Sequence, residues 1–211
     1  MNKKIIISVL SVVILVGMLF ILTGCGSKKE KKVEGVEISH TMGKGNFTVT
    51  VPKNEDGSAK YQFTTEKPDG VAKSSTFYLV TDTAIFGFSS SGLTYNTSSA
   101  YKEKYGETEA TFDGYLALVN DTENSSRPKL AGMEELELNG RKALRYYNRS
   151  GSSSNYSYYG YNYMIAADEI YKGSNVNMIV NYKDETKPTE AKEFDQETLD
   201  IISSLKITLN K

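Results

Sequence analysis

Serine and lysine recur at a spacing that is used in acyl transfer. Three tetrads have a lysine three residues after a serine: Ser99 with Lys102, Ser126 with Lys129, and Ser203 with Lys206. On a helix, this spacing brings the lysine amine within one turn of a serine nucleophile. Both residue types are so frequent in the chain that chance alone accounts for the tetrads, and no Lys-Thr-Gly segment follows them. The tetrads therefore do not predict an acyl-transfer enzyme.

Carboxylates offer a second kind of chemistry, because hydrolysis of a glycosidic bond needs two of them at a fixed separation. Glu134, Glu135 and Glu137 lie together on a predicted strand whose outward face would be solvated in any case. The sequence singles out no pair among its many carboxylates. A carboxylate-based hydrolase that acts on sugars or peptidoglycan therefore remains an alternative, and we assign no catalytic residue.

Histidine and cysteine are too scarce for most metal or nucleophilic sites. His40 is the only histidine and Cys25 the only cysteine. Alternation begins at Val33, and His40 lies just after the strand that this pattern predicts. It has no acidic or hydroxyl motif at a spacing typical of a catalytic triad, so we expect a surface residue. Zinc sites need several such ligands in local pairs, and the chain has no calcium loop or glycine-rich phosphate loop. We predict no metal and no cofactor.

Tyrosine is the residue type most suited to binding. The chain has 15 tyrosines, and several of them lie on two strands that we expect to pair. Alternate residues of a strand share a face, so Tyr159, Tyr161 and Tyr163 would form a ladder of rings. With Tyr146, this ladder could stack on sugar rings or on the backbone of a partner, because a tyrosine ring is apolar with a polar end. The alternative is that these rings form the core of a domain poor in leucine and isoleucine.

The charge balance excludes partners that are held by phosphate neutralisation. The 211 residues carry 25 Lys and Arg against 26 Asp and Glu, which gives a net charge of -1. We therefore predict no nucleic-acid partner.

The first 24 residues predict an export signal, since Lys3 and Lys4 precede an apolar run from Ile5 to Leu22. The run ends in Leu22-Thr23-Gly24-Cys25, which resembles the bacterial lipobox. The resemblance implies that residues 1–24 are removed and that acyl chains such as palmitate are attached to Cys25. These chains would anchor the protein in the cell membrane, facing the extracytoplasmic side. An uncleaved transmembrane helix is the alternative, because such a run nearly spans a ~30 Å hydrocarbon layer.

Periodicity predicts one domain after the anchor. We expect residues 25–44 to form the lipid anchor and a lysine-rich tether, and residues 45–211 to form a single globular domain. Alternation at 47–51, and again near 61–63, 77–79 and 86–88, predicts short antiparallel strands separated by turns. An apolar stripe over 112–119 predicts a helix.

The second half of the domain has clearer boundaries. Asn139-Gly140 predicts a type I′ hairpin, because this dipeptide accepts positive φ twice. A loose loop is expected over 149–157, followed by strands over 159–167 and 176–182. Asp195 predicts the N-cap of a C-terminal helix, and Ile207 and Leu209 a short edge strand.

The order of these elements, from about Gly45 to Leu209, resembles the PsbP-like fold of many small bacterial lipoproteins. The similarity lies in the opening Phe-Thr-Val-Thr-Val-Pro strand, the helix, the Leu-Asn-Gly-Arg-Lys-Ala hairpin and the closing segment from Phe194 to Ile207. It implies an α+β sandwich, with an antiparallel β-sheet and helices packed on it, preceded by the signal helix. It also implies a binding or assembly role in preference to catalysis.

We therefore expect a membrane-anchored, extracytoplasmic lipoprotein that acts as a non-catalytic binding or accessory module of the cell envelope. Its expected partners are the membrane, through acyl chains on Cys25, and another envelope protein or a glycan. The alternatives are the carboxylate-based hydrolase and a substrate-capture component of a transporter, for which the chain is short.

Overall fold

The computed structural model describes residues 34–69, 71, 75–92, 111–120, 130–152, 155–171, 174–183 and 187–210. The lipobox, the predicted tether as far as residue 33, and the tetrads at Ser99 and Ser126 lie outside the described residues. Residues 34–211 belong to a single compact unit. In the described part of the chain, neither helix is long and apolar enough to cross a membrane.

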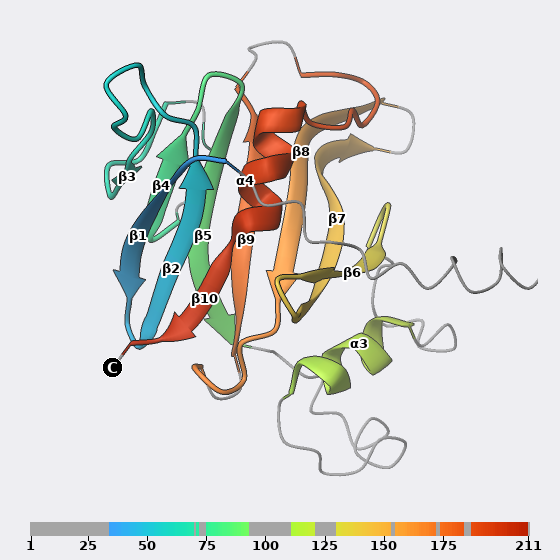
Figure 1. Cartoon of the computed structure of the whole chain (residues 1–211). Coiled ribbons are helices and arrows are strands. Elements are labelled where there is room, and N and C mark those ends of the chain that lie inside the picture. Colours follow the sequence, from blue (N-terminus) through green and yellow to red (C-terminus); the bar gives the residue numbers. More distant parts are fainter. Residues whose placement is uncertain are drawn as a thin grey trace, which may run out of the picture. The chain divides into compact units, whose positions relative to one another are not determined.

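The main sheet has seven strands, all of them antiparallel to their neighbours (Figure 1). The order across the sheet is β3 (Phe63–Thr64), β4 (Phe77–Val80), β5 (Ala84–Gly92), β9 (Ser174–Tyr182), β8 (Asn155–Ile165), β7 (Arg141–Ser152) and β6 (Glu134–Leu138). The predicted strands in these regions are confirmed. Strands β4, β5, β8 and β9 each contribute alternate residues to the main core, as half-buried strands do.

A second sheet has three strands in the order β1 (Val36–Met42), β2 (Gly45–Val51) and β10 (Lys206–Leu209). In the central strand β2, Phe47, Val49 and Val51 are buried, and the threonines between them are half-buried. The predicted C-terminal edge strand is confirmed as β10, which pairs with β2.

The main core lies between the two sheets. The ring of Phe47 is 5.3 Å from that of Phe77 in the main sheet, measured between centroids. Helix α4 (Gln196–Ser204) adds Ile201 and Ile202 to the same apolar cluster. Its N-cap is Asp195 as predicted, and the Asp195 carboxylate accepts a hydrogen bond from the Thr198 N–H at 2.7 Å.

The turn between β6 and β7 is the predicted two-residue hairpin. Asn139 and Gly140 both have positive φ, at 48° and 76°. The Asn139 side chain also donates to the carbonyl oxygens of Ser203, at 2.8 Å, and Leu205, at 2.9 Å. The hairpin therefore satisfies carbonyl groups at the C-terminal end of α4, which otherwise lack helical partners.

Helix α3 (Phe112–Asn120) confirms the predicted apolar stripe and forms a second, smaller core. Phe112 is buried with Leu144 and Met164 of the main sheet. Their neighbours Ala143 and Ile165 belong to the main core instead. Since adjacent residues of a strand point to opposite faces, α3 covers the face of the main sheet that lies away from the small sheet.

The α+β class with antiparallel sheets is thus confirmed in outline, with two local differences. The fold begins at β1, inside the segment expected to be tether, because Ile38 and Met42 are buried against the core. The loop expected over 149–157 is instead a continuation of β7 and β8, which pair as far as Ser152 and Asn155.

Candidate functional site

The outer face of the main sheet carries a pocket of about 310 Å³. Its lining residues come mainly from β4, β5, β9, β8 and β7: Val71, Ser75, Tyr78, Ile85, Gly87, Tyr146, Asn148, Arg149, Ser150, Tyr159, Asn162, Ile179 and Asn181. On β5, β8 and β9, the lining residues alternate with residues of the main core. The pocket and the core therefore use opposite faces of the same strands.

Strand register arranges the floor of the pocket in two rows. One row crosses the sheet through Tyr146, Asn162, Ile179, Gly87 and Tyr78. The next row crosses it through Asn148, Gly160, Asn181, Ile85 and Val80. Each row has one glycine between larger residues, and neither position has room for a Cβ: it would lie 2.4 Å from the Ser75 hydroxyl at Gly87 and 2.1 Å from the Val180 carbonyl oxygen at Gly160.

A β-bulge brings Tyr159 into the pocket. Asn148 pairs with Gly160 whereas Arg149 pairs with Tyr158, so Tyr159 is the extra residue of β8. The bulge reverses the alternation, and Tyr159 lines the pocket while Tyr158 contacts the Tyr147 ring at 5.4 Å. The prediction that Tyr159, Tyr161 and Tyr163 share one face was therefore wrong.

The four tyrosines proposed from the sequence separate into two pairs. Tyr161 and Tyr163 are buried in the main core, where burial is the first cause of their raised pKa values, to about 12 for Tyr163. Tyr146 and Tyr159 line the pocket instead. Burial and the nearby Tyr115 raise the pKa of Tyr146 to about 12, so its phenol stays protonated at neutral pH.

Neutral hydrogen-bonding groups dominate the polar part of the lining. The side-chain Nδ2 of Asn148 donates to the side-chain Oδ1 of Asn181 at 2.8 Å. The hydroxyls of Ser150 and Tyr159 lie 3.0 Å apart. The Asn162 side chain has no hydrogen-bond partner within the described part of the chain. Asn162 is thus the amide most available to a ligand.

Two cationic side chains, Arg149 and Lys187, lie near the tyrosines of β8. The Arg149 guanidinium is 3.8 Å from the Tyr156 ring centroid and donates to the Tyr158 hydroxyl, so aromatic rings already engage it. The Lys187 ammonium lies 4.9 Å from the Tyr159 ring centroid. The hydrogen bond with Ser150, and secondarily the charge of Lys187, lower the pKa of the Tyr159 phenol. The described lining contains no carboxylate.

Glu134 and Glu135, which are neighbours on β6, point to opposite faces of the sheet. Glu134 pairs with Arg145, at 2.6 Å between carboxylate and guanidinium, whereas Glu135 accepts from the Asn120 amide of α3, also at 2.6 Å. Neighbouring residues of a strand face opposite sides, so these two carboxylates do not converge on one substrate.

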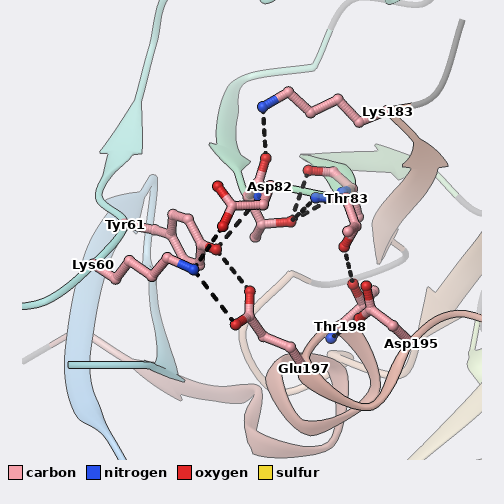
Figure 2. Close-up of polar contacts among 10 residues, drawn as sticks. Lys60, Tyr61, Asp82, Thr83, Lys183, Asp195, Glu197 and Thr198 are labelled. Atoms are coloured by element: carbon pink, nitrogen blue, oxygen red, sulfur yellow. Dashed lines mark hydrogen bonds and ion pairs between the residues drawn. The ribbon is translucent and has the colours of Figure 1, made fainter. Parts of the chain in front are cut away.

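Figure 2 shows a place where two other carboxylates do approach a common group. The Lys60 ammonium lies 2.6 Å from Asp82 in the β4–β5 turn and 3.8 Å from Glu197 in α4. The Tyr61 hydroxyl donates to Glu197 at 2.7 Å. Thr83 and Thr198 join the same turn to α4 through their hydroxyls, 3.3 Å apart.

This network favours a structural role. The bond to Lys60 and the neighbouring Tyr61 lower the pKa of the Asp82 carboxyl, and the bond to Asp82 raises the pKa of Lys60. A glycosidase needs one carboxylic acid with a raised pKa to protonate the leaving group. Asp82 has the opposite shift, so the network joins a turn to a helix and supplies no acid at Asp82.

The remaining reactive candidates do not assemble into a site. His40 lies within β1 and not after it, and its ring packs 4.3 Å from that of Phe77. Ser203 donates to the Asp200 carbonyl oxygen in α4, whereas Lys206 pairs with Glu37 across the small sheet. No group of three His, Cys, Asp or Glu residues in the described ranges could hold a metal ion. Cys25 lies outside these ranges.

The asparagines of the pocket were not predicted, although a signal for them exists. Asn177 and Asn181 alternate with the apolar residues of β9, which indicates a polar face. What the sequence lacks is the pairing of β7, β8 and β9, which brings Asn148, Asn162 and Asn181 together. No family model matches this chain, and a search of curated proteins finds no match.

Proposed function

We propose that the protein is a lipid-anchored binding module of the cell envelope whose pocket holds a small, hydroxyl-rich molecule of the saccharide class. The supporting observation is the pocket floor, in which asparagine amides and tyrosine phenols lie beside isoleucine side chains. Sugars present hydroxyl groups at their edges and apolar C–H groups on their faces, which fits this mixture. The volume of about 310 Å³ lies at the lower end of the ~300–1,000 Å³ typical of ligand pockets, so the occupant is one or two sugar rings.

The cellular placement rests on the lipobox. Acyl chains on Cys25 would anchor the domain to the extracytoplasmic face of the cell membrane, and residues 26–33 would contribute a charged tether. The finer fold assignment, a PsbP-like sandwich preceded by a signal helix, belongs to the same proposal. A Cys25→Ser protein should incorporate no labelled fatty acid and should keep its leader. Labelling of that variant equal to the natural chain would overturn the placement.

Binding is a better account of the pocket than hydrolysis. The sugar-acting hydrolase that the sequence leaves open needs two carboxylates around the scissile bond, and the described lining has none. The amides can donate and accept hydrogen bonds, but they do not supply a proton to a leaving group. The pocket therefore favours retention of an intact ligand.

Titration of the full-length protein in detergent tests this proposal. The probes are glucose, cellobiose, N-acetylglucosamine, N,N′-diacetylchitobiose (hereafter chitobiose) and glucuronic acid, and their binding is measured by calorimetry. We expect saturable binding of at least one of them and a loss of about tenfold in Asn162→Leu, because a buried ligand group then lacks its partner. Asn210→Leu, on an exposed asparagine after β10, is the matched control. Absence of binding by every probe would overturn the proposal.

A further inference from the structure

The amides of Asn148 and Asn181 meet across the middle strand of three. Both residues pair with Gly160, one from β7 and the other from β9. Because position 160 has no side chain, the two amides reach over β8 and join at 2.8 Å. Gly160 has a φ of 141°, and a Cβ there would lie 2.1 Å from the Val180 carbonyl oxygen. The backbone therefore accepts only glycine at this position.

Their mutual hydrogen bond uses one donor and one acceptor of the two amides. Asn148 donates through Nδ2 and Asn181 accepts through Oδ1. The side-chain Oδ1 of Asn148 and Nδ2 of Asn181 have no partner among the described residues. An amide has one acceptor and one NH2 group. If both side chains were rotated by 180°, the pair would still offer one acceptor and one donor. The pair can therefore serve a ligand that itself supplies one N–H donor and one C=O acceptor.

Apolar side chains lie next to this pair. Ile85 pairs with Asn181 across β5 and β9. Ile179 lies two residues before Asn181 on β9 and faces the same side of the sheet. Ile85, Ile179 and Val71 are all buried, and all three line the pocket. A small apolar group next to the ligand amide would be removed from water there.

We propose that the pocket recognises an acetamido group, so that the saccharide it binds is N-acetylated. The ligand N–H would donate to Asn148, its C=O would accept from Asn181, and its methyl group would lie against Ile85 and Ile179. This inference rests on the proposed function and names the ligand class within it. The two asparagines are specificity residues and take no part in bond cleavage.

Chitobiose and cellobiose form a matched pair of probes, since they differ in having an acetamido group or a hydroxyl at C2 of each ring. We expect the full-length protein in detergent to bind chitobiose at least about tenfold more tightly, because two extra hydrogen bonds are made in a partly buried site. The measurement is the ratio of the two dissociation constants by calorimetry.

Asn181→Asp separates recognition from folding. Its carboxylate still accepts from the Asn148 amide but has no N–H to donate, so the chitobiose preference should fall to within about twofold. Asn210→Asp makes the same chemical change on an exposed residue and should keep the tenfold preference. The thermal midpoint of each variant reports whether the fold is retained, and Asn148→Leu gives an independent loss of the acceptor.

Three outcomes are distinguishable. Equal binding of the two disaccharides by the natural chain overturns the acetamido inference and leaves saccharide binding standing. A tenfold preference that survives in both Asn181→Asp and Asn148→Leu also overturns it, because the acetamido group is then recognised elsewhere. Failure of all five saccharides to bind overturns the proposed function itself.

Discussion

Asp195 links the stability of α4 to pH. Its carboxylate accepts from the Thr198 N–H at 2.7 Å. Burial alone would raise the pKa of Asp195, but the hydrogen bonds from Thr83 and Thr198 outweigh it and the pKa is lowered. A carboxyl whose folded pKa is depressed stabilises the fold above its unfolded value of about 3.9, and this contribution is lost as pH falls through the folded pKa.

Asp195→Asn should isolate this contribution, because asparagine caps a helix about as well as aspartate but does not titrate. We expect the difference in unfolding free energy between the natural chain and Asp195→Asn to be largest near neutral pH and to vanish in strong acid. Asp195→Ala should cost about 1 kcal/mol at pH 7. Urea denaturation between pH 7 and pH 2 measures both, and a difference that grows on acidification would contradict the assignment.

At the residue scale, the sequence predicts caps and turns well because their signals are local. Asp195 and the Asn139-Gly140 turn each depend on the backbone within a few residues, and both predictions are confirmed. The arrangement of the pocket residues depends on contacts between distant strands. Asn148 and Asn181 are 33 residues apart and meet only because β8 lies between them. Sequence alone does not give that juxtaposition.

At the element scale, the bulge in β8 decides which tyrosines face the pocket. Strict alternation would place Tyr159 with Tyr161 and Tyr163, and the inserted residue moves it to the opposite face. No local pattern marked the bulge in advance, although Gly160 is a residue type that often accompanies one. Helix α3 and the β6–β7 hairpin were predicted correctly because their periodicity is uninterrupted.

Gly160→Ala should disrupt this part of the sheet. The added Cβ would lie 2.1 Å from the Val180 carbonyl oxygen, in a backbone conformation with φ of 141°. We expect a loss of about 3 kcal/mol in unfolding free energy, together with loss of saccharide binding. The measurements are urea denaturation and calorimetric titration.

Gly140→Ala is the matched control for that substitution. Gly140 also has a positive φ, of 76°, but a Cβ there meets nothing within 4 Å. Gly140→Ala should lower the unfolding free energy by only roughly 1–2 kcal/mol, the cost of a left-handed backbone conformation for a residue with a Cβ. It should leave the pocket unchanged. Equal destabilisation by the two substitutions would show that the approach to Val180 is not what requires glycine at position 160.

At the scale of the whole molecule, the two faces of the main sheet have separate tasks. One face packs against the small sheet and α4, through rings such as Phe77 and Phe88. The other carries α3 at one end and the pocket beside it, with Tyr146 both in the smaller core and in the lining. A substitution in the pocket can therefore change the pocket surface without opening the main core.

The extent of the folded domain gives the last prediction. From the sequence, we placed its start at Gly45 and assigned residues 25–44 to the lipid anchor and tether. In the structure, all seven residues of β1 pair with β2, and Ile38 and Met42 are buried against the core. A chain that begins at Glu34 retains these contacts, whereas one that begins at Gly45 exposes one edge of β2 and part of the core.

We expect the chain from Glu34 to have the thermal midpoint of the full-length protein. The chain from Gly45 should lose at least about 4 kcal/mol, because the removal of two buried side chains costs roughly 2–5 kcal/mol each. Thermal denaturation, followed by tyrosine near-UV circular dichroism, gives the midpoint of each chain, and urea denaturation gives its unfolding free energy. Equal midpoints would mean that β1 is dispensable and that the segment up to residue 44 acts only as a tether. A lower midpoint for the chain from Gly45 alone would assign β1 to the folded domain.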